Sequence, residues 1–65
     1  MYLNKRRVDI AMAKKGYKKK DLAAQCGITS QWLWKILERE SCTPYTISKL
    51  TQALDVTVEY LTEEE

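Results

Sequence analysis

The side chains in this sequence that are best suited to recognising a ligand lie between residues 18 and 38. Three consecutive lysines, Lys18, Lys19 and Lys20, precede the segment SQWLWKI at positions 30–36. Lysine ammonium groups pair with phosphates, and serine, glutamine and lysine side chains hydrogen-bond to base edges in the major groove of DNA. These residue types indicate a nucleic-acid partner, provided that a helix presents them on one face.

Charge is distributed unevenly along the chain, although the net charge is only +2. Residues 1–35 contain nine basic and two acidic residues, whereas residues 36–65 contain two basic and seven acidic residues. Clustered lysine and arginine bind nucleic acid by releasing its condensed counterions. A polyanionic partner therefore explains the basic half better than a solvated face does.

The composition argues against most other classes of function. The 65 residues include no histidine, and no glycine-rich phosphate loop is present, so we expect no enzyme. Cys26 and Cys42 are too few for a zinc site and are interpreted as reduced structural residues of a cytoplasmic protein. No segment approaches the roughly 20 apolar residues that span a bilayer. We therefore expect no cofactor, metal, small-molecule ligand or membrane partner.

The pattern of apolar residues predicts an all-α fold, a compact bundle of five short helices. Gly16 and Gly27 suit left-handed helix ends, and Thr29, Thr43 and Thr57 suit N-caps. The predicted helices cover about residues 2–15, about 18–26, a segment from Thr29 to about 38, about 44–54, and a segment that begins after Thr57. One domain is expected over residues 1–62, followed by an acidic tail at 63–65.

Periodicity also predicts which side chains form the core, because apolar residues recur at intervals of three and four. The predicted inner positions are Leu3, Val8, Ala11, Met12, Leu22, Ala23, Cys26, Ile28, Leu33, Ile36, Leu37, Ile47, Leu50, Leu54, Val58 and Leu61.

The second and third predicted helices are separated by a short turn that contains Gly27. This connection is typical of a helix-turn-helix, in which the second helix of the pair enters the major groove. Ala23 is small where the two helices must cross, and Gly27 lies where the turn requires a positive φ. We therefore place the helix-turn-helix unit at about residues 18–38.

Two motifs resemble the Cro and phage-repressor type of helix-turn-helix protein, also called the Xre family. The first comprises LA at 22–23, GI at 27–28 and TS at 29–30. The second is TISKLTQALDVT at 46–57 followed by EYL at 59–61, which lies outside the DNA-reading unit. The resemblance implies a lambda-repressor-like bundle of four or five helices that binds operator-like double-stranded DNA, often as a dimer.

The chain departs from the family pattern in two places. Lys18 and Lys19 stand where the family commonly has Ser or Thr and then Gln, so a phosphate contact is kept as a charge while a helix cap is lost. The loop LERESCTP replaces the usual ERGKRxP, which puts Glu40 in the place of a glycine. This loop is therefore not expected to supply a basic backbone contact.

A helical wheel assigns roles to the side chains of the third helix. Leu33 and Ile36 point inward, which leaves Gln31, Trp34 and Lys35 on the outward face. The resemblance assigns base reading to the positions of Ser30, Gln31 and Lys35, and we group the outward Trp34 with them. The expected phosphate contacts are Lys18, Lys19, Lys20 and Thr29, with Arg6, Arg7, Lys14 and Lys15 as weaker candidates.

The two tryptophans leave two functions open. Trp32 is expected to be half-buried against the second or fourth helix, and Trp34 to contact DNA sugars, a thymine methyl or a protein partner. The first function is a sequence-specific transcriptional regulator, a Cro-like repressor without a sensing domain that pairs through Val56, Val58, Tyr60 and Leu61. The alternative is a protein-interaction module on the same fold, antirepressor- or antitoxin-like, that uses the tryptophans as anchors.

Overall fold

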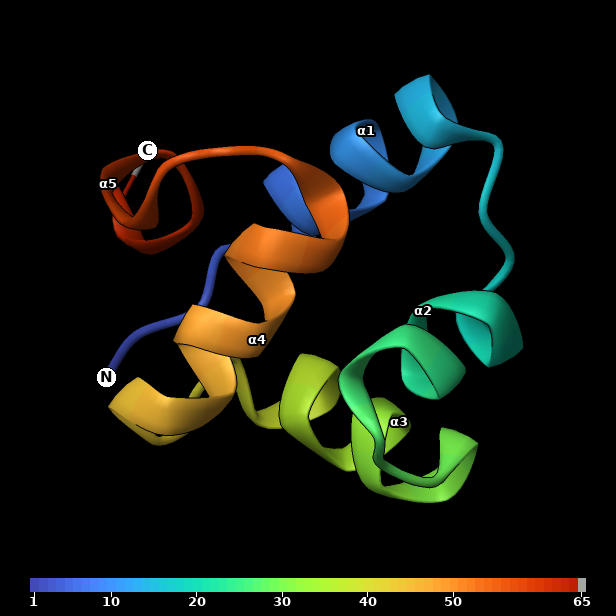
Figure 1. The fold of residues 1–65 in the computed structure, drawn as a ribbon. Coiled ribbons are helices and arrows are strands. Elements are labelled where there is room, and N and C mark those ends of the chain that lie inside the picture. Colours follow the sequence, from blue (N-terminus) through green and yellow to red (C-terminus); the bar gives the residue numbers. More distant parts are fainter. Residues whose placement is uncertain (65) are drawn as a thin grey trace.

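A computed structural model describes residues 1–64 and shows five α-helices in them, in agreement with the predicted all-α class (Figure 1). The helices are α1 (Lys5–Lys15), α2 (Lys19–Cys26), α3 (Ser30–Arg39), α4 (Pro44–Leu54) and α5 (Val58–Thr62). The molecule measures 25 × 22 × 18 Å along its principal axes. Helix α4 crosses the middle, where it packs against α2 on one side and α1 and α5 on the other (Figure 1).

The predicted helix ends are confirmed by the capping contacts. Gly16 and Gly27 end α1 and α2 with φ values of 71° and 72°, in the left-handed region where glycine carries no Cβ penalty. The hydroxyls of Thr29, Thr43 and Thr57 each accept a hydrogen bond from a backbone N–H in the first turn of the following helix. The sequence therefore specifies one end of each of the five described helices.

The start of the first helix was predicted wrongly, because α1 begins at Lys5 and not near residue 2. Tyr2 forms an isolated antiparallel bridge with Ser41, and the backbone N–H of Leu3 donates to the Glu40 carbonyl at 2.9 Å. Leu3 is fully buried, and it enters the core from this extended segment and not from a helix. Periodicity placed Leu3 in a helix because it cannot detect a partner almost forty residues away.

The fourteen buried apolar side chains form one cluster that includes residues from all five helices and from the N-terminal segment. All the predicted inner positions belong to it except Ile28, which is half-buried and packed against it, and Val58, which is 38% exposed. Helix α5 is only five residues long and buries one side chain, Leu61. Val58 was therefore wrongly predicted to be part of the core.

The burial of side chains in α5 also corrects the surface that was predicted to pair two copies of the chain. Leu61 has no exposed area, and Tyr60 is half-buried with the Arg7 guanidinium 4.8 Å from the centre of its ring. Leu61 is therefore unavailable as an anchor for a second copy, and Tyr60 keeps only part of its surface exposed. Of the four residues proposed for pairing, only Val56, half-buried, and Val58 present surface without these internal contacts.

Asn4 joins the N-terminal segment to the end of α5. Its side-chain oxygen accepts from the backbone N–H of Arg7 at 3.2 Å, and its Nδ2 donates to the Glu63 carbonyl at 2.9 Å. Arg7 adds a hydrogen bond to the Tyr60 carbonyl and a 3.0 Å ion pair with the Glu63 carboxylate. The predicted acidic tail is thus attached to α1 at Glu63, and its last residue, 65, lies outside the described residues.

Two helices end in a left-handed residue that is not glycine. Glu40 follows α3 with φ 52° and Asp55 follows α4 with φ 57°. An L-residue in this region is strained by roughly 1–2 kcal/mol, less for aspartate because its short polar side chain bonds locally. Glu40, which stands where the sequence pattern that the chain resembles has a glycine, therefore takes a backbone conformation that favours glycine.

We predict that Asn4→Ala destabilises the protein by about 2 kcal/mol, because it removes an N-cap and leaves the Glu63 carbonyl without its donor. Urea unfolding monitored by circular dichroism measures the change. Asn4→Ser is the matched control: it keeps an acceptor for the Arg7 N–H and should lose only about 1 kcal/mol. Equal stability of both variants and the unmodified protein would contradict the role assigned to Asn4.

We also predict that Glu40→Gly stabilises the protein by about 0.5–1 kcal/mol, because relief of the left-handed strain exceeds the added entropy of the unfolded chain. Asp55→Gly is the comparison variant and should gain less, since aspartate tolerates this conformation better. Thermal unfolding of the two variants side by side measures both effects. A fall in stability for Glu40→Gly would show that its side-chain contact with the Tyr2 hydroxyl, at 3.2 Å, matters more than the strain.

Candidate nucleic-acid interface

Helix α3 has one buried face and one exposed face. Leu33, Ile36 and Leu37 are at most 3% exposed, while the other seven residues of the helix are all exposed. Burial of one such aliphatic side chain contributes about 1.5–3 kcal/mol, which fixes the rotation of the helix about its axis. The polar face of α3 is therefore held toward solvent by the core beneath it.

The orientation of α3 on α2 depends on a compact turn. The N–H of Ile28 donates to the Ala23 carbonyl at 3.0 Å, and Gly27 takes the left-handed conformation between the two helices. Ala23 is 2% exposed and lies in the core with Leu22 and Cys26. The positive φ predicted for Gly27 and the burial predicted for Leu22, Ala23 and Cys26 are confirmed, and a short turn joins α2 to α3 (Figure 1).

The predicted base readers all lie on the exposed face of α3. Gln31 and Lys35 are separated by one helical turn, as are Ser30 and Trp34, so the four form two adjacent rows. Glu38 continues the row of Trp34 toward the end of the helix. The amino-terminal half of this face thus presents hydroxyl, amide and ammonium groups, and the carboxylate lies one turn further on.

The three lysines at the start of α2 differ in their environment. Lys18 and Lys20 are exposed, whereas Lys19 is half-buried. Lys18 is the N-cap residue and makes no side-chain cap; instead its backbone N–H donates to the Asp21 carboxylate at 2.9 Å. The loss of a side-chain cap predicted at this position is confirmed, and Asp21 supplies a contact from within the helix that the sequence analysis did not identify.

Lys19 contacts Trp34 across the junction of the two helices. Its Nζ lies 4.1 Å from the centre of the indole ring, within the range of a cation–π interaction. From the sequence, Lys19 is predicted to contact a phosphate and Trp34 to make a separate contact with DNA or a protein partner. No helical spacing relates residue 19 to residue 34, so only the packing angle of α2 on α3 could show this pair.

Trp32 lies on the other side of α3. It is 44% exposed, close to the 49% of Trp34, so the predicted contrast between a packed and an exposed tryptophan is wrong. Together with Met1 and Pro44 it lines a hollow of about 490 Å³ between the end of α3 and the start of α4. The indole therefore faces α4, as predicted, without being covered by it.

The weaker basic candidates of α1 have other contacts or positions that explain them. Arg7 is engaged with Tyr60 and Glu63, which corrects its assignment as a weak phosphate candidate. Lys14 and Lys15 occupy the last turn of α1, where a cation is favoured by the helix dipole. These structural roles account for the positions of Arg7, Lys14 and Lys15 without a nucleic acid.

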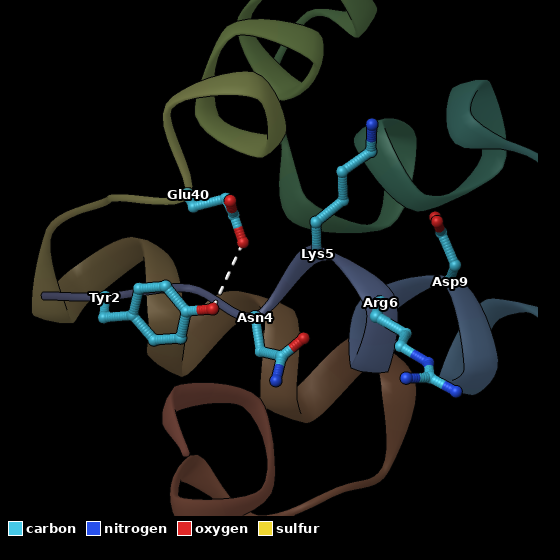
Figure 2. Close-up of a pocket in the computed structure, with 6 residues that line it drawn as sticks. All are labelled: Tyr2, Asn4, Lys5, Arg6, Asp9 and Glu40. Carbon is cyan, nitrogen blue, oxygen red and sulfur yellow. Dashed lines mark hydrogen bonds between the residues drawn. The ribbon is translucent and has the colours of Figure 1, made fainter. Parts of the chain in front are cut away.

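A second concave region lies beside α1 and contains neither the base readers nor the lysines of α2. It measures about 410 Å³ and is lined by Tyr2, Asn4, Lys5, Arg6, Asp9 and Glu40. Figure 2 shows the Tyr2 hydroxyl directed at Glu40, and Lys5 and Arg6 pointing in different directions from the first turn of α1. Two basic and two acidic side chains share this wall, so it does not offer a uniformly positive surface to an anion.

Both cysteines are free thiols. Burial raises the pKa of the Cys26 thiol, and the Lys49 ammonium opposes this shift. Burial likewise raises the pKa of Cys42, opposed by the N-terminal amino group. Within the part of the chain that the structure describes, no group of three or more metal-ligating side chains is present.

Comparison with known proteins gives one family. A family model for the Cro/C1-type helix-turn-helix DNA-binding domain matches residues 7–63, which include all of α2 and α3. No curated protein and no solved structure matches the chain. None of the helices in residues 1–64 is long and apolar enough to cross a membrane.

Proposed function

Because the chain belongs to the Cro/C1-type helix-turn-helix DNA-binding domains, we propose that it is a sequence-specific transcriptional regulator that reads a short operator through α3. Ser30, Gln31 and Lys35 would contact base edges in the major groove. Gln pairs well with adenine N6 and N7, Lys with guanine O6 and N7, and Ser with either. The observation that carries this proposal is the exposed polar face of a helix whose opposite face is buried.

The lysines of α2 support the same function. Lys18, Lys19 and Lys20 are placed at the helix end where the backbone dipole disfavours cations, and only Asp21 in that turn has the opposite charge. A DNA phosphate would remove this repulsion and would also accept from the free N–H groups of the first turn. We assign phosphate contact to these lysines, with the Thr29 hydroxyl as a neutral contact at the start of α3.

Repression and pairing are the finer parts of the proposal. Occupying an operator needs only the DNA-contacting surface, so a Cro-like repressor controlled by its own concentration is the simplest regulator on this fold. A few base contacts specify only a short half-site, which favours a symmetric dimer with half-sites about 34 Å apart. Val58, with Val56 beside it, is the part of the predicted pairing surface that stays available.

A second candidate function rests on the hollow at Trp32. Met1 and Trp32 are 50% and 44% exposed beside it, and an apolar side chain of a protein partner could occupy the space between α3 and α4. An antirepressor-like or antitoxin-like module would use this surface and would bind DNA weakly or not at all.

Selection from a pool of random duplexes tests the first function. We expect a defined recognition sequence, with an affinity that falls steeply as salt increases from about 50 to 200 mM. Two copies of a half-site in the selected duplexes would support the dimer. No binding to any duplex at low salt would overturn the proposal and favour the interaction module.

Substitutions distinguish the two kinds of contact. We expect Gln31→Ala and Lys35→Ala each to cost about 1–3 kcal/mol of binding to the selected duplex and to relax selectivity at one base position. Lys20→Ala should weaken binding to all sequences and lower the slope of log affinity against log salt by about 0.9. Lys14→Ala removes a charge from α1 and is the control that should leave binding nearly unchanged. The same loss of binding from the three lysine variants, Lys14→Ala included, would show a general charge effect and contradict the assigned roles.

A further inference from the structure

Of the three lysines at the start of α2, Lys19 is the one whose side chain folds back onto the protein. Its neighbours Lys18 and Lys20 are exposed, while Lys19 is half-buried with its Nζ 4.1 Å from the centre of the Trp34 ring. The pair spans the junction of α2 and α3. The contact between Lys19 and Trp34 thus links the start of α2 directly to the exposed face of α3.

This position is electrostatically unfavourable for a cation in the free protein. The first turn of α2 carries the positive end of the helix dipole and two further ammonium groups on adjacent residues. A lysine side chain also has large rotamer freedom that solvent exposure would retain. The negative face of the indole ring attracts the cation and so compensates part of these costs.

We propose that Trp34 is a positioning residue, whose indole holds the Lys19 ammonium at the α2–α3 junction as a preorganised anchor for a DNA phosphate. The inference rests on the proposed function and changes the role assigned to Trp34 from base contact to support of a phosphate contact. It also explains why so large an apolar side chain is tolerated on the exposed face of α3. The ammonium lies over one face of the ring, and the indole remains 49% exposed with this contact in place.

The alternative for Trp34 makes a different prediction. A tryptophan that reads a thymine methyl acts on one base position and independently of Lys19. A tryptophan that positions Lys19 acts on a phosphate, so its loss weakens binding to all sequences and has no further effect once Lys19 is removed.

A double-mutant cycle in the absence of DNA tests the contact itself. Lys19→Met keeps the length of the side chain and removes its charge, and Trp34→Leu removes the ring. We expect the folding equilibrium constants of the full chain to show a coupling of about two- to fivefold between these substitutions. Lys20→Met and Trp32→Leu form the matched control cycle, with the same residue types, and should show no coupling.

DNA binding by the same four proteins tests the positioning role of Trp34. These are the unmodified protein, the two single variants and the double variant. Each is measured on the duplex selected for the unmodified protein and on a random-sequence duplex. We expect Lys19→Met, Trp34→Leu and the double variant to lose similar affinity on both duplexes. The salt slope should fall by about 0.9 for Lys19→Met and in the same direction for Trp34→Leu, with part of the loss restored by Trp34→Tyr.

The outcomes separate this inference from the function on which it rests. Additive losses, or a loss confined to one base position of the selected duplex, would overturn the positioning role while leaving DNA binding intact. Failure of the unmodified protein to bind any duplex at low salt would overturn the proposed function, and the positioning role with it.

Discussion

The structure depends on the burial of one face of α3. Leu33, Ile36 and Leu37 have almost no exposed area, so any rotation of the helix would bring apolar surface into water. The turn at Gly27 and the small Ala23 then fix α3 against α2. Because the buried face is fixed, the exposed face is fixed with it. The side chains assigned to base reading thus take their direction from residues that never meet a ligand.

Electrostatics and stability are opposed at the start of α2. Three lysines occupy a helix end that favours anions, and Asp21 meets only part of that requirement through its contact with the Lys18 N–H. Local violations of helix preferences that have no structural compensation are expected at functional sites. Lys14 and Lys15, by contrast, lie where the dipole of α1 favours them. The position of a lysine relative to helix ends therefore distinguishes the lysines proposed to bind DNA from those with a structural role better than the net charge does.

The N-terminal segment stabilises the domain by joining the end of α3 to α1 and to α5. Leu3 fills the core, Tyr2 bridges to Ser41, and Asn4 bonds both to α1 and to the end of α5. Arg7 adds contacts with Tyr60 and Glu63. These links close the bundle at its two termini, which matters in a chain of 65 residues because a small domain buries a small fraction of its surface. Glu63, in the acidic carboxy-terminal segment, contributes to these links through its contacts with Asn4 and Arg7.

The sequence by itself determined the features that depend on nearby residues. Glycine at 16 and 27, threonine at 29, 43 and 57, and apolar residues at intervals of three and four define helix ends and inner faces, because caps and helix periodicity act within one or two turns. The exposure of Ser30, Gln31 and Lys35 follows from the same periodicity. Only the tertiary structure decided which side chains from distant segments meet. It showed Leu3 entering the core from an extended segment, Arg7 engaged with α5, Trp32 beside a hollow at α4, and Lys19 over the ring of Trp34. Each of these depends on the angle and distance between elements, which result from the packing of the whole core and not from any spacing along the chain.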